Sequence, residues 1–508
     1  MILLDGQNLS LATLQAIANG TEQIQINPLN IEKIKEAEKF VAKITKGKKA
    51  IYGINTGFGH LASVRIDIDK LEELQTNLLI SHACGVGDIL PIKTVRVMLA
   101  LRINALIQGF SGLRYQVIEQ MLLLLNHNII PVVYEQGSLG ASGDLALLSH
   151  MSLPLIGLGE VFYQDQKMSA LVAYQASGLN PLPSLQPKEG LSLINGTQAM
   201  SAIGGLALVD AFRLLNLASL ALALSMEALG GLLDAYDEKV HKLRRQDGQT
   251  LVARQVRSFL KNSLNITKTN EKKVQDAYSL RCAPQVHGAV LQALWHVKSI
   301  LENEFNAVTD NPLVFAKEEE VISAGNFHGE PLALALDYLG IAASELASIS
   351  ERRIERLVNP QLNNGLPPFL TNSSGLNSGF MIVQYTAASL VSENKVLSHP
   401  ASVDSIPSSA NQEDHVSMGT TAARKARDII KNAYQVIALE IFASTQALGF
   451  RGSEGLGLVT SKAYRLIKEK IPFITKDELM YPYIQELTKL IMSDDFYNSL
   501  FERTDIIE

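Results

Sequence analysis

The sequence contains few cysteines, few aromatic residues and no extended block of one charge. Cys84 and Cys282 are the two cysteines among 508 residues, and 6% of the residues are aromatic. Two cysteines cannot build a disulfide framework in so long a chain, so we expect a reducing, cytoplasmic location and two buried thiols that pack as small hydrophobic groups. With a net charge of −6 and no basic run longer than 46–49, the chain is not expected to bind nucleic acid.

The sequence also lacks the patterns typical of a secretory signal peptide and of a membrane-spanning helix. The first ten residues contain Asp5 and no Lys or Arg, which does not fit a signal peptide. The most apolar segment, about 199–233, carries Asp210, Arg213 and Glu227 within the length that a bilayer crossing requires. We therefore expect no membrane partner and interpret this segment as a helix of the core.

Hydrophobic residues, in contrast, are abundant at 47%, and they recur with helical spacing. A chain of 508 residues exceeds the usual size of one core, so we predict a smaller mixed N-terminal domain at 1–198 and a long-helix bundle at 199–508. Several predicted helices are two to three times the usual length of roughly 11–12 residues, and such helices favour burial between subunits of an oligomer. These helices are predicted at 199–233, 284–306, 331–358, 379–398 and 416–447.

The run Gly-Ser-Leu-Gly-Ala-Ser-Gly-Asp at 137–144 lies between an apolar stretch and a helical pattern. If the amide nitrogen of Gly143 approached the carbonyl carbon of Ala141, a five-membered ring could close, and loss of water from Ser142 would leave an electrophilic double bond. Glycine at the attacking nitrogen permits this approach. An ordinary helix start capped by Ser142 or Asp144 is the simpler interpretation of the triplet alone. A hydrolase nucleophile fits less well, because Asp144 stands where that motif needs glycine.

Polar loops between the predicted helices carry groups that could bind an amino acid. The Arg281 guanidinium suits a carboxylate, and Asn195 could donate to the same carboxylate or to an oxygen of a ring at 141–143. His82 and Glu413 could bind a polar ring, and the phenols of Tyr52 and Tyr278 could move a proton. Each residue alone is more simply a surface or core side chain. No metal-ligand spacing, P-loop or dinucleotide motif is present.

Several of these segments, taken together and in this order, resemble the aromatic amino acid ammonia-lyases, and the resemblance covers nearly the whole chain. The segments are 52–59 (YGINTGFG), 137–146 (GSLGASGDLA), 193–198 (LINGTQ), 275–282 (QDAYSLRC), 309–312 (TDNP), 325–329 (GNFHG) and 405–419.

The resemblance implies a mainly α fold of the fumarase and aspartase superfamily and a homotetramer whose active sites are shared between subunits. It implies that Ala141, Ser142 and Gly143 mature autocatalytically into a 4-methylidene-imidazol-5-one group, with no external cofactor. Tyr52 would be the base for the β-proton, with Tyr278 as the other candidate phenol, and Arg281 would bind the α-carboxylate. The other residues expected to line the site are Asn195, Gln275, Tyr278 and Phe327.

Ser81-His82 together with Glu413 is similar to the histidine-type pattern of that family. A carboxylate opposite a benzene ring would be buried unpaired, whereas opposite an imidazole it gains a hydrogen bond. The expected reaction is elimination of ammonia from L-histidine to give trans-urocanate, the first step of histidine degradation. The alternatives are a tyrosine or phenylalanine ammonia-lyase or a 2,3-aminomutase on the same scaffold, and, from another class, an inactive helical binding protein.

Overall fold

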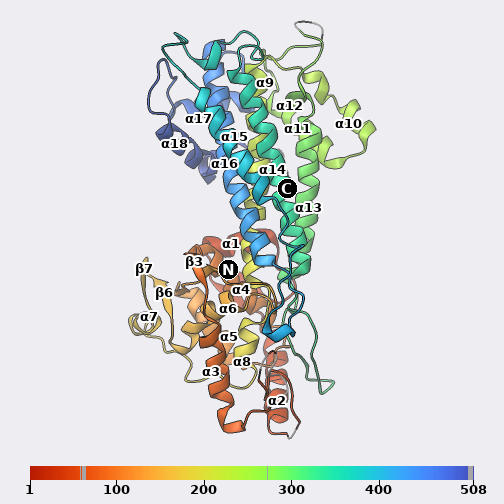
Figure 1. Ribbon diagram of the computed structural model, residues 1–508, viewed down its shortest axis with the longest axis vertical. Coiled ribbons are helices and arrows are strands. Elements are labelled where there is room, and N and C mark those ends of the chain that lie inside the picture. Colours follow the sequence, from red (N-terminus) through yellow and green to blue (C-terminus); the bar gives the residue numbers. More distant parts are fainter. Residues whose placement is uncertain are drawn as a thin grey trace. The chain divides into compact units, whose positions relative to one another are not determined.

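The computed structural model describes residues 1–508 except 48, 58, 60–63, 270, 272, 502–506 and 508. Phe58 of the 52–59 segment and Lys48 of the basic run 46–49 therefore lie outside the described residues. The mainly α-helical class is confirmed (Figure 1). Two compact units are present: unit 1 comprises 1–209, 298–337 and 400–424, and unit 2 comprises 210–297, 338–399 and 425–508. The domain boundary expected after residue 198 stays a prediction.

The first 200 residues combine short helices with small sheets. Among the described residues, three small sheets lie in this region, β1 with β2, β3 with β5, and β4 with β6 and β7, and a fourth, β8 with β9, lies later in the chain. The strands are β1 Ile2–Leu4, β2 Ile24–Ile26, β3 Val86–Ile89, β4 Ile130–Pro131, β5 Tyr134–Gln136, β6 Glu160–Tyr163, β7 Gln166–Ser169, β8 Leu313–Phe315 and β9 Glu320–Ile322. The helices that precede residue 198 are α1 Leu11–Asn19, α2 Leu29–Thr45, α3 Leu71–His82, α4 Ile92–Leu106, α5 Tyr115–Asn126, α6 Leu145–Ser152, α7 Ala170–Ser177 and α8 Glu189–Ile194.

Helices α3, α6 and α8 pack against one another in unit 1. Leu78 and Leu79 of α3, Leu148 of α6 and Leu193 of α8 are buried, and burial of their apolar side chains holds the three helices together. The pocket described below is lined from the ends and edges of these helices: α3 ends at His82, and α8 ends one residue before Asn195.

The five long helices predicted from the sequence are all present. They are α9 Gln198–Ala228, α13 Ala283–Phe305, α14 Glu330–Val358, α15 Met381–Leu397 and α16 Gly419–Arg451. The first is shorter than predicted, because it ends at Ala228 and the chain turns at Gly230, where φ is 58°. Shorter helices are α10 Glu238–Arg244, α11 Asp247–Phe259, α12 Tyr278–Arg281, α17 Leu458–Lys468, α18 Tyr481–Met492 and α19 Asp494–Leu500.

A buried ion pair joins three of the long helices in unit 2. Glu440 of α16 accepts two hydrogen bonds from Arg353 of α14, at 2.5 and 2.7 Å, and both side chains are inaccessible to solvent. Ser225 of α9 and Ser350 of α14 also donate to this carboxylate. The other buried residues of these helices are mostly apolar, so this network gives their contact a specific geometry in addition to hydrophobic packing.

Two helical stretches, Glu189–Ala228 and Glu330–Val358, are long and apolar enough to cross a membrane by composition alone. In their most apolar windows, 83% and 67% of the residues are buried inside the protein. Their apolar surface is thus already covered by protein, as in core helices. The expectation of two buried cysteines was wrong: Cys84 is exposed and Cys282 is partly exposed. Cys84 lies two residues after the end of α3, and its thiol donates to the carbonyl of His82.

Candidate active site

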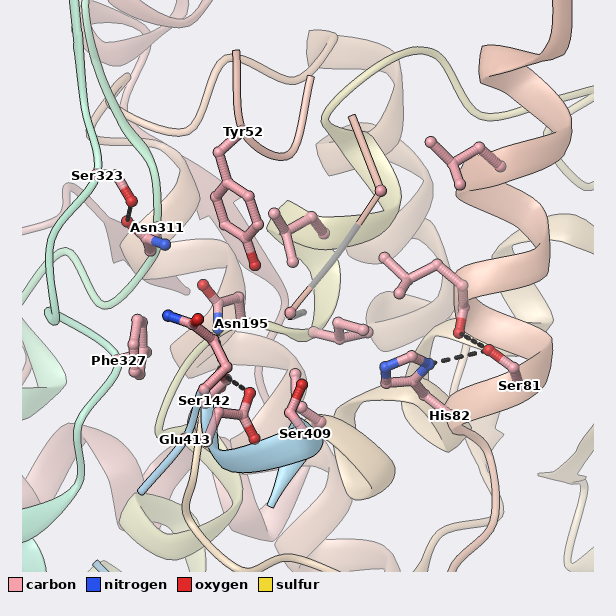
Figure 2. Close-up of a pocket in the computed structure, with 18 of the residues that line it drawn as sticks. Tyr52, Ser81, His82, Ser142, Asn195, Asn311, Ser323, Phe327, Ser409 and Glu413 are labelled. Atoms are coloured by element: carbon pink, nitrogen blue, oxygen red, sulfur yellow. Dashed lines mark hydrogen bonds between the residues drawn. The ribbon is translucent and has the colours of Figure 1, made fainter. Parts of the chain in front are cut away.

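A pocket of about 840 Å³ in unit 1 is lined by side chains from distant parts of the sequence (Figure 2). Figure 2 shows Ser142 between Asn195 and Glu413, with Phe327 on one side and His82 on the other. Six residues expected at the site line this pocket: Tyr52, His82, Ser142, Asn195, Phe327 and Glu413.

The conformation of the triplet depends on two glycines. Gly143 has φ 75°, a region that residues with a Cβ rarely adopt, and a Cβ built there would overlap the backbone of Gly196. The next amide, that of Asp144, donates to the Gly196 carbonyl at 2.7 Å. Gly143 is therefore held tightly against the 195–197 turn, as a ring closure at its nitrogen would require.

Ser142 makes two contacts that bear on its chemistry. The Asn195 amide donates to the Ser142 carbonyl oxygen at 2.8 Å, and the Ser142 hydroxyl donates to Glu413 Oε1 at 2.9 Å. Of the two roles considered for Asn195, the geometry matches donation to a ring oxygen, because the Ser142 carbonyl would become that oxygen. The hydroxyl that would be lost lies beside a carboxylate.

Asp144 holds the triplet in place without capping its own helix. Helix α6 begins after Asp144, but the side chain makes no capping bond to it. Instead, Oδ2 accepts from the amides of Ala199 and Met200 at the start of α9, both at 2.9 Å, and Oδ1 accepts from Ser138 and Thr420. Burial raises the pKa of the Asp144 carboxyl, while these donors act in the opposite direction. Capping of α6 by this side chain, the simpler interpretation of the sequence, is therefore wrong.

Tyr52 points into the pocket as a largely buried phenol. Burial raises its pKa, and the negative charges of Glu413 and Asp310 raise it further, whereas a hydrogen bond with the Gly59 backbone lowers it. The phenol is thus the dominant form at neutral pH. A phenolate at this position would need added positive charge nearby.

His82 is oriented by its sequence neighbour. The Ser81 hydroxyl lies 3.0 Å from His82 Nδ1, and it also lies 3.3 Å from the Leu78 carbonyl oxygen. Burial lowers the pKa of His82, so the ring is neutral at physiological pH although Glu413 favours its protonation. Ser81 contacts one ring nitrogen, Nδ1, and none of the described residues forms a hydrogen bond with the other, Nε2.

Glu413 is fixed by a short local structure. Its backbone pairs with Ser408 in both directions, and Oε2 accepts from the Ser408 hydroxyl at 2.8 Å. None of the described residues that line the pocket is Lys or Arg. Within the described part of unit 1, the pocket therefore offers a polar ring an acceptor but offers an α-carboxylate no cation.

The three remaining site candidates belong to unit 2 and are not among the described residues that line the pocket. The Arg281 guanidinium lies over the Tyr278 ring, 4.7 Å from its centre, and Tyr278 is 70% exposed. Arg281 Nε is buried and has no hydrogen-bond partner among the described residues. Gln275 is exposed.

Sequence reasoning missed several polar residues of the pocket. Asn311 and Ser323 line it and bond to each other at 3.2 Å, and Asn77, Ser409 and Gln412 also line it. Asn311 and Ser409 lie in segments that were singled out, at 309–312 and 405–419, but no spacing rule distinguishes one polar residue of such a loop from the next. Asn77 lies within α3, where its helical setting gave no functional signal.

Comparison with known proteins shows which family this chain is similar to. A model of the family "aromatic amino acid lyase" matches residues 9–469. A histidine ammonia-lyase of Caldanaerobacter subterraneus subsp. tengcongensis is 50% identical over 507 residues, covering 100% of this chain and 99% of that protein. The solved structure of histidine ammonia-lyase from Trypanosoma cruzi has a TM-score of 0.90 and 41% identity, covering 99% of this chain and 96% of that one. Tyrosine aminomutase from Streptomyces globisporus has a TM-score of 0.93 and 34% identity, covering 98% of each chain.

The protein is thus an enzyme, a carbon–nitrogen lyase. It belongs to the aromatic amino acid lyase family. Members of this family use a 4-methylidene-imidazol-5-one group.

Proposed function

We propose that this protein eliminates ammonia from L-histidine to give trans-urocanate, the first step of histidine degradation. The proposal rests on the presence of both Glu413 and His82 in the pocket that Ser142 also lines. The full-length relatives that are named histidine ammonia-lyase support it. A cytoplasmic location accords with this function.

The residues around 141–143 fit the group that the family uses. Gly143 is pressed against Gly196, and Asn195 already donates to the carbonyl oxygen that would belong to the ring. We propose that the group forms from Ala141, Ser142 and Gly143, with no external cofactor. When formed, it supplies an electrophile that makes the substrate amine a better leaving group. Asn195 stabilises negative charge on its oxygen, as oxyanion-hole donors do.

Glu413 and His82 together suit a neutral imidazole ring. Before maturation the Ser142 hydroxyl donates to Glu413 Oε1. Maturation removes this hydroxyl, so Oε1 becomes available to accept a hydrogen bond from a ring N–H. A benzene or phenol ring would leave the carboxylate without that partner. Tyr52 lies in the same pocket and takes the β-proton in our proposal, with Phe327 packing against the substrate.

The α-carboxylate needs a cation that the described lining residues do not provide. We propose a homotetramer in which Arg281, Gln275 and Tyr278 of another subunit complete each site. The exposure of Gln275 and Tyr278 and the unpartnered Arg281 Nε support this assembly. Arg281 would bind the carboxylate with two parallel hydrogen bonds, and Tyr278 remains a second candidate for the base.

A tyrosine or phenylalanine ammonia-lyase or an aminomutase is the alternative. The TM-score of 0.93 with a tyrosine aminomutase reflects a shared fold and does not discriminate between these reactions. The polar pair of His82 and Glu413 favours histidine over a carbocyclic substrate.

The decisive test offers L-histidine, L-phenylalanine and L-tyrosine in parallel and follows, by ultraviolet absorbance, the conjugated acrylate that elimination would give from each, which is urocanate from histidine. We expect rapid absorbance growth with histidine and a kcat/KM at least about 100-fold lower with the other two, the discrimination expected when a buried polar group is left unpaired. A β-amino acid product, or equal rates with phenylalanine, would contradict the proposal. Chromatographic identification of the product separates lyase from aminomutase activity.

A further inference from the structure

A fully buried arginine lies directly behind the turn that contacts the triplet. Arg102 of α4 has no solvent exposure, and its Nε donates to the Ser192 carbonyl at 2.9 Å. One terminal nitrogen donates to the Thr309 carbonyl at 2.8 Å and to Gln198 Oε1 at 3.1 Å. Gln198 in turn donates to the Thr309 hydroxyl at 2.7 Å. The guanidinium thereby joins three chain segments that surround the 195–197 turn.

Gly196 lies between this guanidinium and the triplet. On one side, a Cβ at Gly196 would overlap Arg102 and Gln198 and would lie 2.8 Å from the Thr309 carbonyl. On the other side, the Gly196 carbonyl oxygen is where a Cβ at Gly143 would be, and it accepts from the Asp144 amide. The Arg102 guanidinium therefore contacts Gly196, and Gly196 contacts Gly143. No side chain separates the backbones of these two glycines.

Burial lowers the pKa of Arg102 to about 10, with the nearby Asp310 carboxylate opposing the shift. Arg102 is thus charged at neutral pH, and the Asp310 carboxylate, 3.9 Å away, compensates this charge only in part, because it also pairs with Lys188. A lysine at position 102 would keep the charge but could not reach the three acceptors at once, because its donors radiate from one atom. These contacts therefore need the planar guanidinium, whose donors point to separate acceptors.

We propose that Arg102 is a positioning residue for maturation of the triplet: by fixing the far side of Gly196 it keeps the Gly143 nitrogen pressed toward the Ala141 carbonyl carbon. In the reaction, the Gly143 nitrogen forms a bond to that carbon, whose oxygen leaves as water with two amide protons. Ser142 then loses its hydroxyl and its α-proton as a second water. This inference rests on the maturation that we propose above, and Arg102 itself touches none of the reacting atoms.

The test measures intact mass and folding separately. Wild type and the Arg102→Lys variant are synthesised in a cell-free system, and samples are quenched at intervals and weighed by mass spectrometry. The matured chain is lighter than its translation product by two molecules of water. We expect ~10- to 100-fold slower appearance of the lighter species in Arg102→Lys, the size of effect that follows a displacement of about 1 Å from near-attack geometry. Its kcat per matured site should equal that of wild type.

Arg96 provides a matched control on the same helix. It is also buried, and it donates to the carbonyls of Ile17 and Leu125, away from the triplet. Arg96→Lys should lower the melting temperature as Arg102→Lys does but leave the rate of mass loss unchanged. If Arg102→Lys is recovered only as unfolded chain, Gln198→Met is tested in its place. This variant removes one acceptor of the Arg102 guanidinium with little change in side-chain volume, and it should also slow maturation.

Equal maturation rates in wild type and in the folded variant would overturn the role of Arg102. Equal slowing in Arg96→Lys would also overturn it, because the effect would then follow from lost stability alone. A wild-type protein that turns over substrate at its full translated mass would instead overturn the proposed maturation, so the two failures are distinguishable.

Discussion

Two buried carboxylates, one in each unit, are satisfied in different ways. Asp144 in unit 1 accepts from two backbone amides and two hydroxyls, and no Lys or Arg within the described residues forms an ion pair with it. Glu440 in unit 2 accepts two hydrogen bonds from Arg353 and further bonds from two serines. The first network fixes loops around a reactive triplet, and the second joins long helices.

The difference follows from what each region does. In unit 1, amide and hydroxyl donors from several chain segments hold the Asp144 carboxylate, and the Arg102 guanidinium lies on the far side of Gly196. In the helix bundle, a bidentate arginine gives a geometrically specific contact between long helices. The Asp144 network should therefore be sensitive in activity and the Glu440 network in stability.

The largest expected effect is on activity, from Ser142→Ala. The variant cannot form the exocyclic double bond, so turnover of L-histidine should fall to background. Because the Ser142 side chain makes one hydrogen bond, to Glu413, thermal unfolding should be nearly unchanged. Ultraviolet assay and calorimetry measure the two quantities. Retained turnover would refute the chemistry that we assign to the triplet.

Arg353→Met tests the other side of the comparison. It leaves Glu440 buried without its cation, which should cost ~3–5 kcal/mol of unfolding free energy. Replacing Glu440 with Leu in the same chain should recover much of the loss, as measured by denaturant titration. If single and double variants are equally unstable, the ion pair does not explain the stability of these helices.

Glu413→Gln should reduce kcat/KM for L-histidine by roughly 10- to 100-fold, the value of a charge-assisted hydrogen bond. Turnover of L-phenylalanine, which offers no ring N–H, should change less. Steady-state kinetics with both substrates give the comparison, and Ser409→Ala serves as a control that alters the pocket lining without removing charge. Equal losses for the two substrates would remove Glu413 from the basis of selectivity.

Glu413→Gln should also change the pH dependence of kcat/KM. The Glu413 charge contributes to the raised pKa of the Tyr52 phenol, after burial, which is the larger cause. Removing that charge lowers this pKa, so the phenolate form is reached at lower pH. If Tyr52 is the base, the rising alkaline limb of kcat/KM should move to lower pH in Glu413→Gln. A limb that does not move, or moves upward, would favour Tyr278.

The smallest expected effect comes from Ser81, which lines the pocket and contacts His82. Ser81→Val removes the hydroxyl that lies 3.0 Å from His82 Nδ1, and Ser81→Thr retains a hydroxyl in a side chain of the same shape. Loss of one hydrogen bond of ~0.5–1.5 kcal/mol should raise KM for L-histidine a few-fold in the Val variant, with little change in kcat. The Thr variant should stay close to wild type. Identical KM values in the two variants would show that the hydroxyl does not orient the ring.

The positions of the long helices and the reactive potential of the triplet could be predicted from the sequence. Helices α13, α14, α15 and α16 follow an apolar period that extends over many turns, so neighbouring residues specify them. The Ala-Ser-Gly order at 141–143 permits ring closure but by itself is more simply a helix start, so the motifs along the whole chain were needed to favour ring closure. Exposure of Cys84 could not be predicted, because burial depends on which elements pack over a loop.

What the sequence by itself determined, then, is helical structure and the reactive groups, since both depend on residues adjacent in the chain. Only the tertiary structure decided that the Asp144 side chain bonds to the start of α9, that Asn195 donates to Ser142, and that Arg102 lies behind Gly196. These contacts join segments about 50 to 100 residues apart through loops without periodicity. Their geometry is set by how the helices pack, and that packing leaves no pattern in the loops it positions.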